Sequence, residues 1–126
     1  MVDGDILDSG LVGSDSAVHT DGYATTCATY VTPSGDHSGT LLFIGTVQEE
    51  DDTDYRHEVY ILGYRKDGAS LAIRGSSSLG AIDSGGGFTF SFTTSGEDIL
   101  AECTAVDKCS SGGFFVGISV ERNIAT

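Results

Sequence analysis

The chain has 126 residues, a length that favours one domain with a modest core. Its 19 Asp and Glu residues outnumber 6 Lys and Arg residues, so the formal net charge is −13. This charge argues against binding to nucleic acid or to an anionic membrane surface, because both are bound through clustered Lys and Arg. No apolar run approaches the ~20 residues that a membrane span needs.

Residues 1–22 are rich in Gly, Asp and Ser and show no sustained period. This composition predicts an extended N-terminal arm, which either stays unpacked or docks on a neighbouring subunit. The chain starts with acidic residues, such as Asp3 and Asp5, instead of the basic and then apolar pattern of a secretory signal. We therefore expect it to be synthesised in the cytoplasm without a signal peptide.

Residues 23–126 are predicted to form one domain of short apolar runs separated by Gly, Ser and Asp turns. Several runs alternate with period two, and no stretch of ten or more residues has a convincing helical period. The pattern predicts an all-β fold, an antiparallel, jelly-roll-like β-sandwich of seven to eight strands. The predicted strands are 23–31, 40–48, 55–65, 69–75, 87–94, 99–106 and 114–121.

Alternation within these runs predicts which side chains share a face. Phe88, Phe90 and Phe92 lie on one side of their strand and are predicted to fill the core. Residues 41–44 are apolar on both sides, as in a strand that is covered on both faces. Two further sets share a face, namely Val59 with Ile61, and Phe114 with Val116, Ile118 and Val120.

Two glycine-containing segments, Asp67-Gly68 and 110–113, are predicted as turns between strands. Neither Gly112-Gly113 nor 85–87 precedes a helix or a lysine, so these glycines do not indicate a phosphate site.

Asp36-His37-Ser38 contains the residue types of a hydrolytic triad, but adjacent residues cannot adopt the convergent triad geometry. His57 is in phase with Val59 and is predicted as a half-buried sheet residue, because no partner stands at metal-ligand spacing. We find no catalytic residues and interpret the chain as a non-enzyme.

The densest acidic cluster falls between two predicted strands. Carboxylates in such a loop can bind calcium, although the spacing does not match an EF-hand, and a solvated hairpin loop is the alternative. The candidate calcium ligands are Glu49, Glu50, Asp51, Asp52 and Asp54.

The three cysteines are an odd number, so they do not form a disulfide framework. Cys103 and Cys109 could close a small loop in an oxidising compartment, and three reduced thiols are the alternative. Five tyrosines could stack on sugars or serve as sheet residues, and Tyr60 and Tyr64 are predicted to share one face.

From about residue 26 to residue 123, the order of elements resembles small β-sandwich domains of tailed-bacteriophage virion proteins, of the tail- or fibre-associated or decoration type. The resemblance lies in the strand 41–47, the hairpin Tyr64-Arg65-Lys66-Asp67-Gly68, the strand 100–106 and the aromatic start of the final strand 114–121. These are patterns of residue class, and they carry no catalytic or ligand-binding residue to this chain.

The resemblance implies a non-enzymatic virion structural protein, located in the tail, neck or fibre or decorating the head. Its partners would be other virion proteins and further copies of the chain in a homo-oligomer. The alternative function is a carbohydrate-binding module, calcium-dependent through the acidic loop, with a host-surface glycan as its partner.

Overall fold

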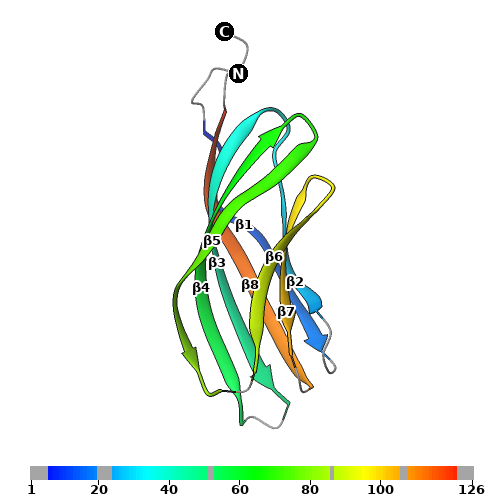
Figure 1. Cartoon of the computed structure of the whole chain (residues 1–126), viewed down its shortest axis with the longest axis vertical. Helices are drawn as coiled ribbons and strands as arrows, with labels where there is room; N and C mark the ends of the chain where they lie inside the picture. Colours follow the sequence, from blue (N-terminus) through cyan, green and yellow to red (C-terminus); the bar gives the residue numbers. More distant parts are fainter. Residues whose placement is uncertain (1–5, 20–23, 51–52, 86, 106–107, 122–126) are drawn as a thin grey trace.

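A computed structural model describes residues 6–19, 24–50, 53–85, 87–105 and 108–121. Within these ranges the protein is all-β, with eight strands in two antiparallel sheets that pack as a sandwich (Figure 1). The predicted fold class is confirmed. No helix with the length and apolarity of a bilayer-spanning segment occurs in the described residues.

The larger sheet has five strands in the order β1-β8-β3-β4-β5. All neighbouring pairs are antiparallel, and the two hairpins β3–β4 and β4–β5 supply three of the strands. The strands are β1 (Ile6–His19), β8 (Cys109–Glu121), β3 (His37–Glu49), β4 (Tyr55–Asp67) and β5 (Ser70–Asp83).

The smaller sheet has three strands in the order β2-β7-β6. They are β2 (Ala24–Val31), β7 (Asp98–Thr104) and β6 (Thr89–Ser95). All seven predicted runs correspond to strands of the two sheets. The observed β3, β5 and β8 extend beyond their predicted bounds, because polar and glycine residues at their ends continue the ladders.

The predicted N-terminal arm does not dock on another subunit in this structure. It pairs within its own chain. Residues 6–19 are extended, but they form β1, which pairs with β8 of the same chain along most of its length. A strand at the sheet edge satisfies the backbone groups of β8 that would otherwise stay unpaired. Hydrogen bonding of the backbone needs no apolar period, so the composition of this segment did not indicate a strand.

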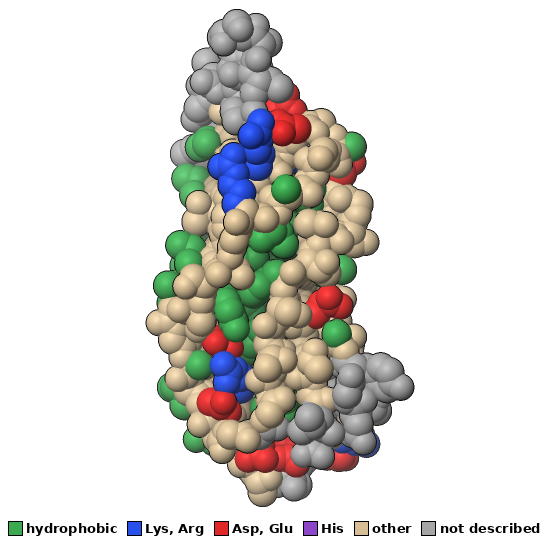
Figure 2. Space-filling model, in the orientation of Figure 1, with side chains coloured by type: hydrophobic (Ala, Val, Ile, Leu, Met, Phe, Trp, Pro, Cys, Tyr) green, Lys and Arg blue, Asp and Glu red, His purple; other side chains and the backbone are tan. Residues whose placement is uncertain are grey.

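The core lies between the sheets and is rich in aromatic rings. Phe43 contacts Phe90, Phe92 and Phe115 with ring centroids 5.3, 5.3 and 5.4 Å apart. Phe88 and Phe90 are buried and Phe92 is partly buried, so the predicted core face of β6 is confirmed. In Figure 2, hydrophobic side chains are also visible between the sheets on the side where β5 and β6 form the edges.

Gly45 and Gly113 are cross-strand partners on β3 and β8, and both lie against the Phe43 ring. A Cβ atom on Gly113 would come within 2.5 Å of Phe43 Cε1, and one on Gly45 within 2.5 Å of Cε2. The prediction that 110–113 is a turn is therefore wrong. These residues continue β8, and the absence of side chains makes room for a ring on the neighbouring strand.

None of the three cysteines forms a disulfide in the structure, and all three are buried. Cys103 and Cys109 are not joined, and burial, together with the neighbouring thiols of Cys27 and Cys109, raises the pKa of Cys103 to about 12. The alternative of reduced, small apolar strand residues is thus the observed one.

Candidate interaction surface

The face of the larger sheet that points away from the smaller sheet carries an unusual set of side chains. On the three central strands, outward positions alternate with the buried residues Leu41, Phe43, Leu62 and Phe115. The outward positions are every second residue from Ser38 to Gln48 on β3, from Tyr55 to Gly63 on β4 and from Ser110 to Val120 on β8. None of them is Asp, Glu, Lys or Arg, although the chain has 25 such residues.

Apolar side chains form rows across these strands. Leu42 pairs with Val116 on one side and Ile61 on the other, and the next row joins Ile44 to Phe114 and Val59. We call this surface the outer apolar face, and it comprises Leu42, Ile44, Val59, Ile61, Phe114, Val116, Ile118 and Val120. Ile118 remains 46% exposed and Ile61 37%.

Val59 and Ile61 share one face of their strand, as predicted, and the structure shows that this face points away from the smaller sheet. Val59 and Ile61 point outward, while Glu58 and Tyr60, the residues between and before them, point toward the other sheet. Residues 41–44 were predicted to be covered on both faces. The smaller sheet covers Leu41 and Phe43, and no described residue of the chain covers the side of Leu42 and Ile44.

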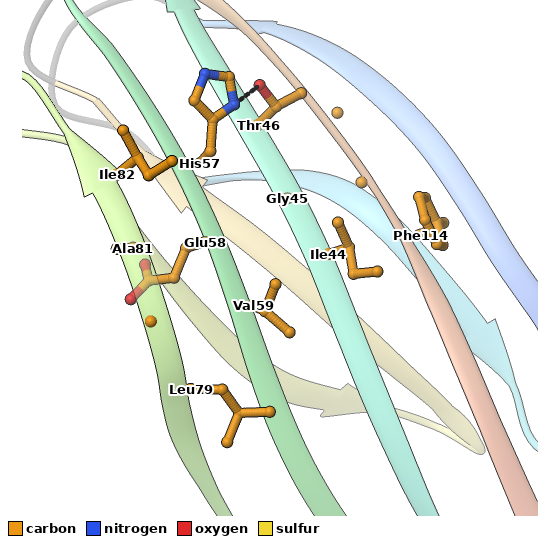
Figure 3. A pocket seen from close by; sticks show the side chains of 13 residues that line it. Ile44, Gly45, Thr46, His57, Glu58, Val59, Leu79, Ala81, Ile82 and Phe114 are labelled. Atoms are coloured by element: carbon orange, nitrogen blue, oxygen red, sulfur yellow. Dashed lines mark hydrogen bonds between the residues drawn. The ribbon is translucent and has the colours of Figure 1, made fainter.

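A shallow groove of about 810 Å³ runs over this face toward β5. Figure 3 shows Ile44, Val59, Leu79 and Phe114 lying side by side, one from each of four neighbouring strands. A bulge in β5 separates the partners of Val59 and Tyr60 and leaves Leu79 unpaired, with its side chain 59% exposed in the groove.

His57 and Thr46 form the polar edge of the groove. They are cross-strand partners, and Nδ1 of His57 lies 2.8 Å from the Thr46 hydroxyl (Figure 3). His57 is exposed, so the predicted half-burial is wrong, although its phase with Val59 is confirmed. The reason is that the face it shares with Val59 is the open one.

Behind the groove, on the inner side of the sheet, Glu58 is 4% exposed and fully paired. Its carboxylate accepts hydrogen bonds from Arg56 Nε at 2.8 Å and from the Ser78 hydroxyl at 2.7 Å. Burial raises the pKa of Glu58, but these hydrogen bonds and the Arg56 charge outweigh burial and leave the pKa below its usual value. Arg56 also bridges Asp83 on β5, so the cluster fixes β5 to β4.

The two ends of the outer apolar face differ in charge, since one carries both basic and acidic side chains and the other is mainly acidic. At the β4–β5 hairpin end, Arg74 is exposed and lines a hollow of about 250 Å³ with Ile118 and Val120. Arg65 lies at the same end and is bridged by Asp67. At the opposite end the β3–β4 hairpin, residues 49–54, has five carboxylates in its sequence. Figure 2 shows basic side chains gathered near one end with acidic ones beside them, and a group of acidic side chains at the other end.

The acidic hairpin is also the predicted calcium loop. Glu50 pairs with Lys108 at 3.3 Å, Glu49 accepts a hydrogen bond from Thr53 and Asp54 accepts one from Ser84. Asp51 and Asp52 lie outside the described residues. Within the part of the chain that the structure describes, no three His, Cys, Asp or Glu side chains are placed to hold a metal ion, and the calcium loop stays a prediction.

Asp36 and His37 make structural hydrogen bonds in the fold. His37 is fully buried, its Nδ1–H donates to the Gly35 carbonyl and its Nε2 lies 2.9 Å from the Tyr64 hydroxyl. Asp36 instead accepts a hydrogen bond from the backbone of Gly68. The three residues do not converge on a common point for catalysis.

The four tyrosines in the described residues do not gather on an open surface. Tyr60 and Tyr64 share a face as predicted, but it is the inner one, where Tyr64 is buried and Tyr60 packs on Phe92. Tyr30 is buried in the core, and Tyr55 is exposed at one end of the groove beside His57. Tyr23 lies outside the described residues.

No protein-family model matches the sequence, and no curated protein matches it significantly. Two solved structures are similar to it in part, the tailspike protein of Acinetobacter phage vB_ApiP_P1 (TM-score 0.48, 18% identity, 84% of this chain) and that of Acinetobacter baumannii phage AM24 (TM-score 0.42, 9% identity, 85% of this chain). The chain spans 22% and 25% of the lengths of these two proteins.

Proposed function

We propose that this chain is a non-enzymatic structural protein of a virion, located in the tail, neck or fibre or decorating the head, and that it acts by protein–protein assembly. One observation carries the proposal. An acidic chain with a net charge of −13 keeps the outward positions 38–48 on β3, 55–63 on β4 and 110–120 on β8 free of Asp, Glu, Lys and Arg.

A solvent-facing sheet ordinarily alternates apolar residues inside with polar or charged residues outside. Contiguous exposed apolar surface of this kind is typical of a protein-binding site. The β-strand surface is rigid, since it is set by the backbone ladder, and a flat rigid face suits repeated docking. The sequence resemblance to phage virion β-sandwich domains supports a virion as the setting for that docking.

The test is incorporation into particles. Virions purified on a density gradient are analysed by quantitative mass spectrometry, and we expect peptides of this chain at a fixed ratio to the major capsid protein. The chain carrying Val59→Asp on the outer apolar face should be depleted at least tenfold, while Thr93→Asp on the exposed outer side of β6 should be retained. Absence of the wild-type chain from particles would overturn the proposal.

A further inference from the structure

We infer that the partner covering the outer apolar face is a second copy of this chain, stacked face to face with its strands antiparallel to those of the first. This inference rests on the proposed function, because it names the partner that the docking surface takes. It is carried by the area of the face and by the distribution of charge around it.

The area is sufficient for a stable contact between two copies. The three strands of the outer apolar face together with the neighbouring β5, at about 4.8 Å spacing and with eleven residues at about 3.3 Å each, span roughly 700 Å². A standard interface buries about 800 Å² on each partner. Two such faces can pack as sheets do in a sandwich, about 10 Å apart.

The chemistry of the face also suits a copy of itself. Because its central positions hold no charged side chain, two copies can approach without burying an unpaired charge, which would cost several kcal/mol. A partner with a strongly charged surface would have to desolvate that charge against Ile44, Val59 and Phe114.

The charged ends select the orientation. Arg74 lies at the β4–β5 end beside Ile118 and Val120, and Glu49, Glu50 and Asp54 of the acidic β3–β4 hairpin lie at the other end. A two-fold axis in the plane of the interface and perpendicular to the strands brings Arg74 of each copy toward the acidic hairpin of the other. A parallel arrangement would place acidic hairpin against acidic hairpin, and like charges across an interface cost several kcal/mol. An isologous contact of this kind also closes, so it limits assembly at this face to pairs.

The experiment is sedimentation equilibrium of the full chain at physiological ionic strength. We expect a dimer for the wild type, monomer for Val59→Asp, and dimer for the control Thr93→Asp. Circular dichroism melts show whether each variant is folded. A folded wild-type monomer at all accessible concentrations, or a stable trimer or larger ring, would overturn the inference.

Charge exchange tests the orientation. Arg74→Glu alone, and Glu49→Lys with Glu50→Lys and Asp54→Lys, should each weaken the homodimer by about tenfold or more, because each places like net charges at both ends of the contact. Mixing the two variants should restore dimerisation, since both contacts in the heterodimer then join opposite charges. Failure of the mixture to recover would overturn the antiparallel arrangement.

The two proposals fail in different ways. A chain that is monomeric in solution but present in virions retains the proposed function and loses only the self-docking. A chain that dimerises through this face but is absent from virions loses the proposed setting.

Discussion

The hydroxyl groups of Tyr30 and Tyr64 lie 3.0 Å apart in the core and join the two sheets, since Tyr30 is on β2 and Tyr64 is on β4. The rings meet edge to face with centroids 5.7 Å apart. The Tyr64 hydroxyl also lies 2.9 Å from Nε2 of His37, which is fully buried. The three side chains form a polar network inside an otherwise apolar core.

Tyr64→Phe should destabilise the fold by about 1–3 kcal/mol, because it removes the hydroxyl to which both neighbours bond in a buried site. Tyr30→Phe should cost less, about 1 kcal/mol, since the Tyr64–His37 contact remains. Urea denaturation of the two variants measures both values. Equal stability of Tyr64→Phe and the wild type would contradict the network's contribution.

Gly113→Ala should destabilise the protein by about 1–3 kcal/mol, because overpacked core positions force side chains from their rotamers. The added Cβ would meet the Phe43 ring at 2.5 Å and the Ile44 carbonyl oxygen at 2.9 Å. Gly63→Ala is the matched control in the same sheet, since a Cβ there has no neighbour within 4 Å. Thermal melts that rank the two variants equally would show that Gly113 is not required by the ring.

The stability of the protein should depend on pH through Glu58. A carboxyl whose pKa is lowered in the folded state contributes stability above its unfolded pKa, near 4.5, and loses it as the pH falls through the lowered value. Glu58→Gln should therefore cost about 1–2 kcal/mol at pH 7 and flatten the loss below pH 4.5. Denaturation curves between pH 7 and pH 3 measure this.

The control for Glu58 is Glu50→Gln, whose ion pair with Lys108 is largely exposed and should contribute little. If the wild type and Glu58→Gln lose stability in parallel on acidification, the Arg56–Glu58–Ser78 contacts are not the source of the pH dependence.

The sequence predicted the sandwich and most of its strands because alternation and turn residues act locally. Alternation shows which residues share a face, but not which face meets the other sheet. On β8, Phe114 and Val116 are larger and more apolar than Gly117 and Ser119, yet the smaller residues lie on the inner side. Gly117 is required there, because a Cβ would come within 2.4 Å of Leu41 Cδ2.

The outer apolar face was thus visible in the sequence only in part. The run 41–44, apolar on both sides, predicted that both surfaces of β3 are covered, whereas the described residues cover only the side of Leu41 and Phe43. Its neighbours on the open side, Ile61 and Val116, follow from strand order and register, which depend on contacts between residues far apart in the chain. Strand β1 escaped prediction because a ladder along a sheet edge needs no apolar pattern.

The native cysteines should not react when an introduced cysteine on the outer apolar face is labelled. Cys27, Cys103 and Cys109 are at most 2% exposed, and burial raises the pKa of Cys103 to about 12. Since the thiolate is the nucleophile, the folded wild type should resist maleimide labelling at neutral pH.

The most direct measurement is maleimide labelling of Ile61→Cys and of Thr93→Cys, each compared between the dilute isolated chain and purified particles. We predict that position 61 reacts readily in the dilute chain and at least tenfold more slowly in particles, while position 93 reacts at similar rates in both. Equal labelling of position 61 in the two states would show that the outer apolar face remains open after assembly, and would contradict its role as the docking surface.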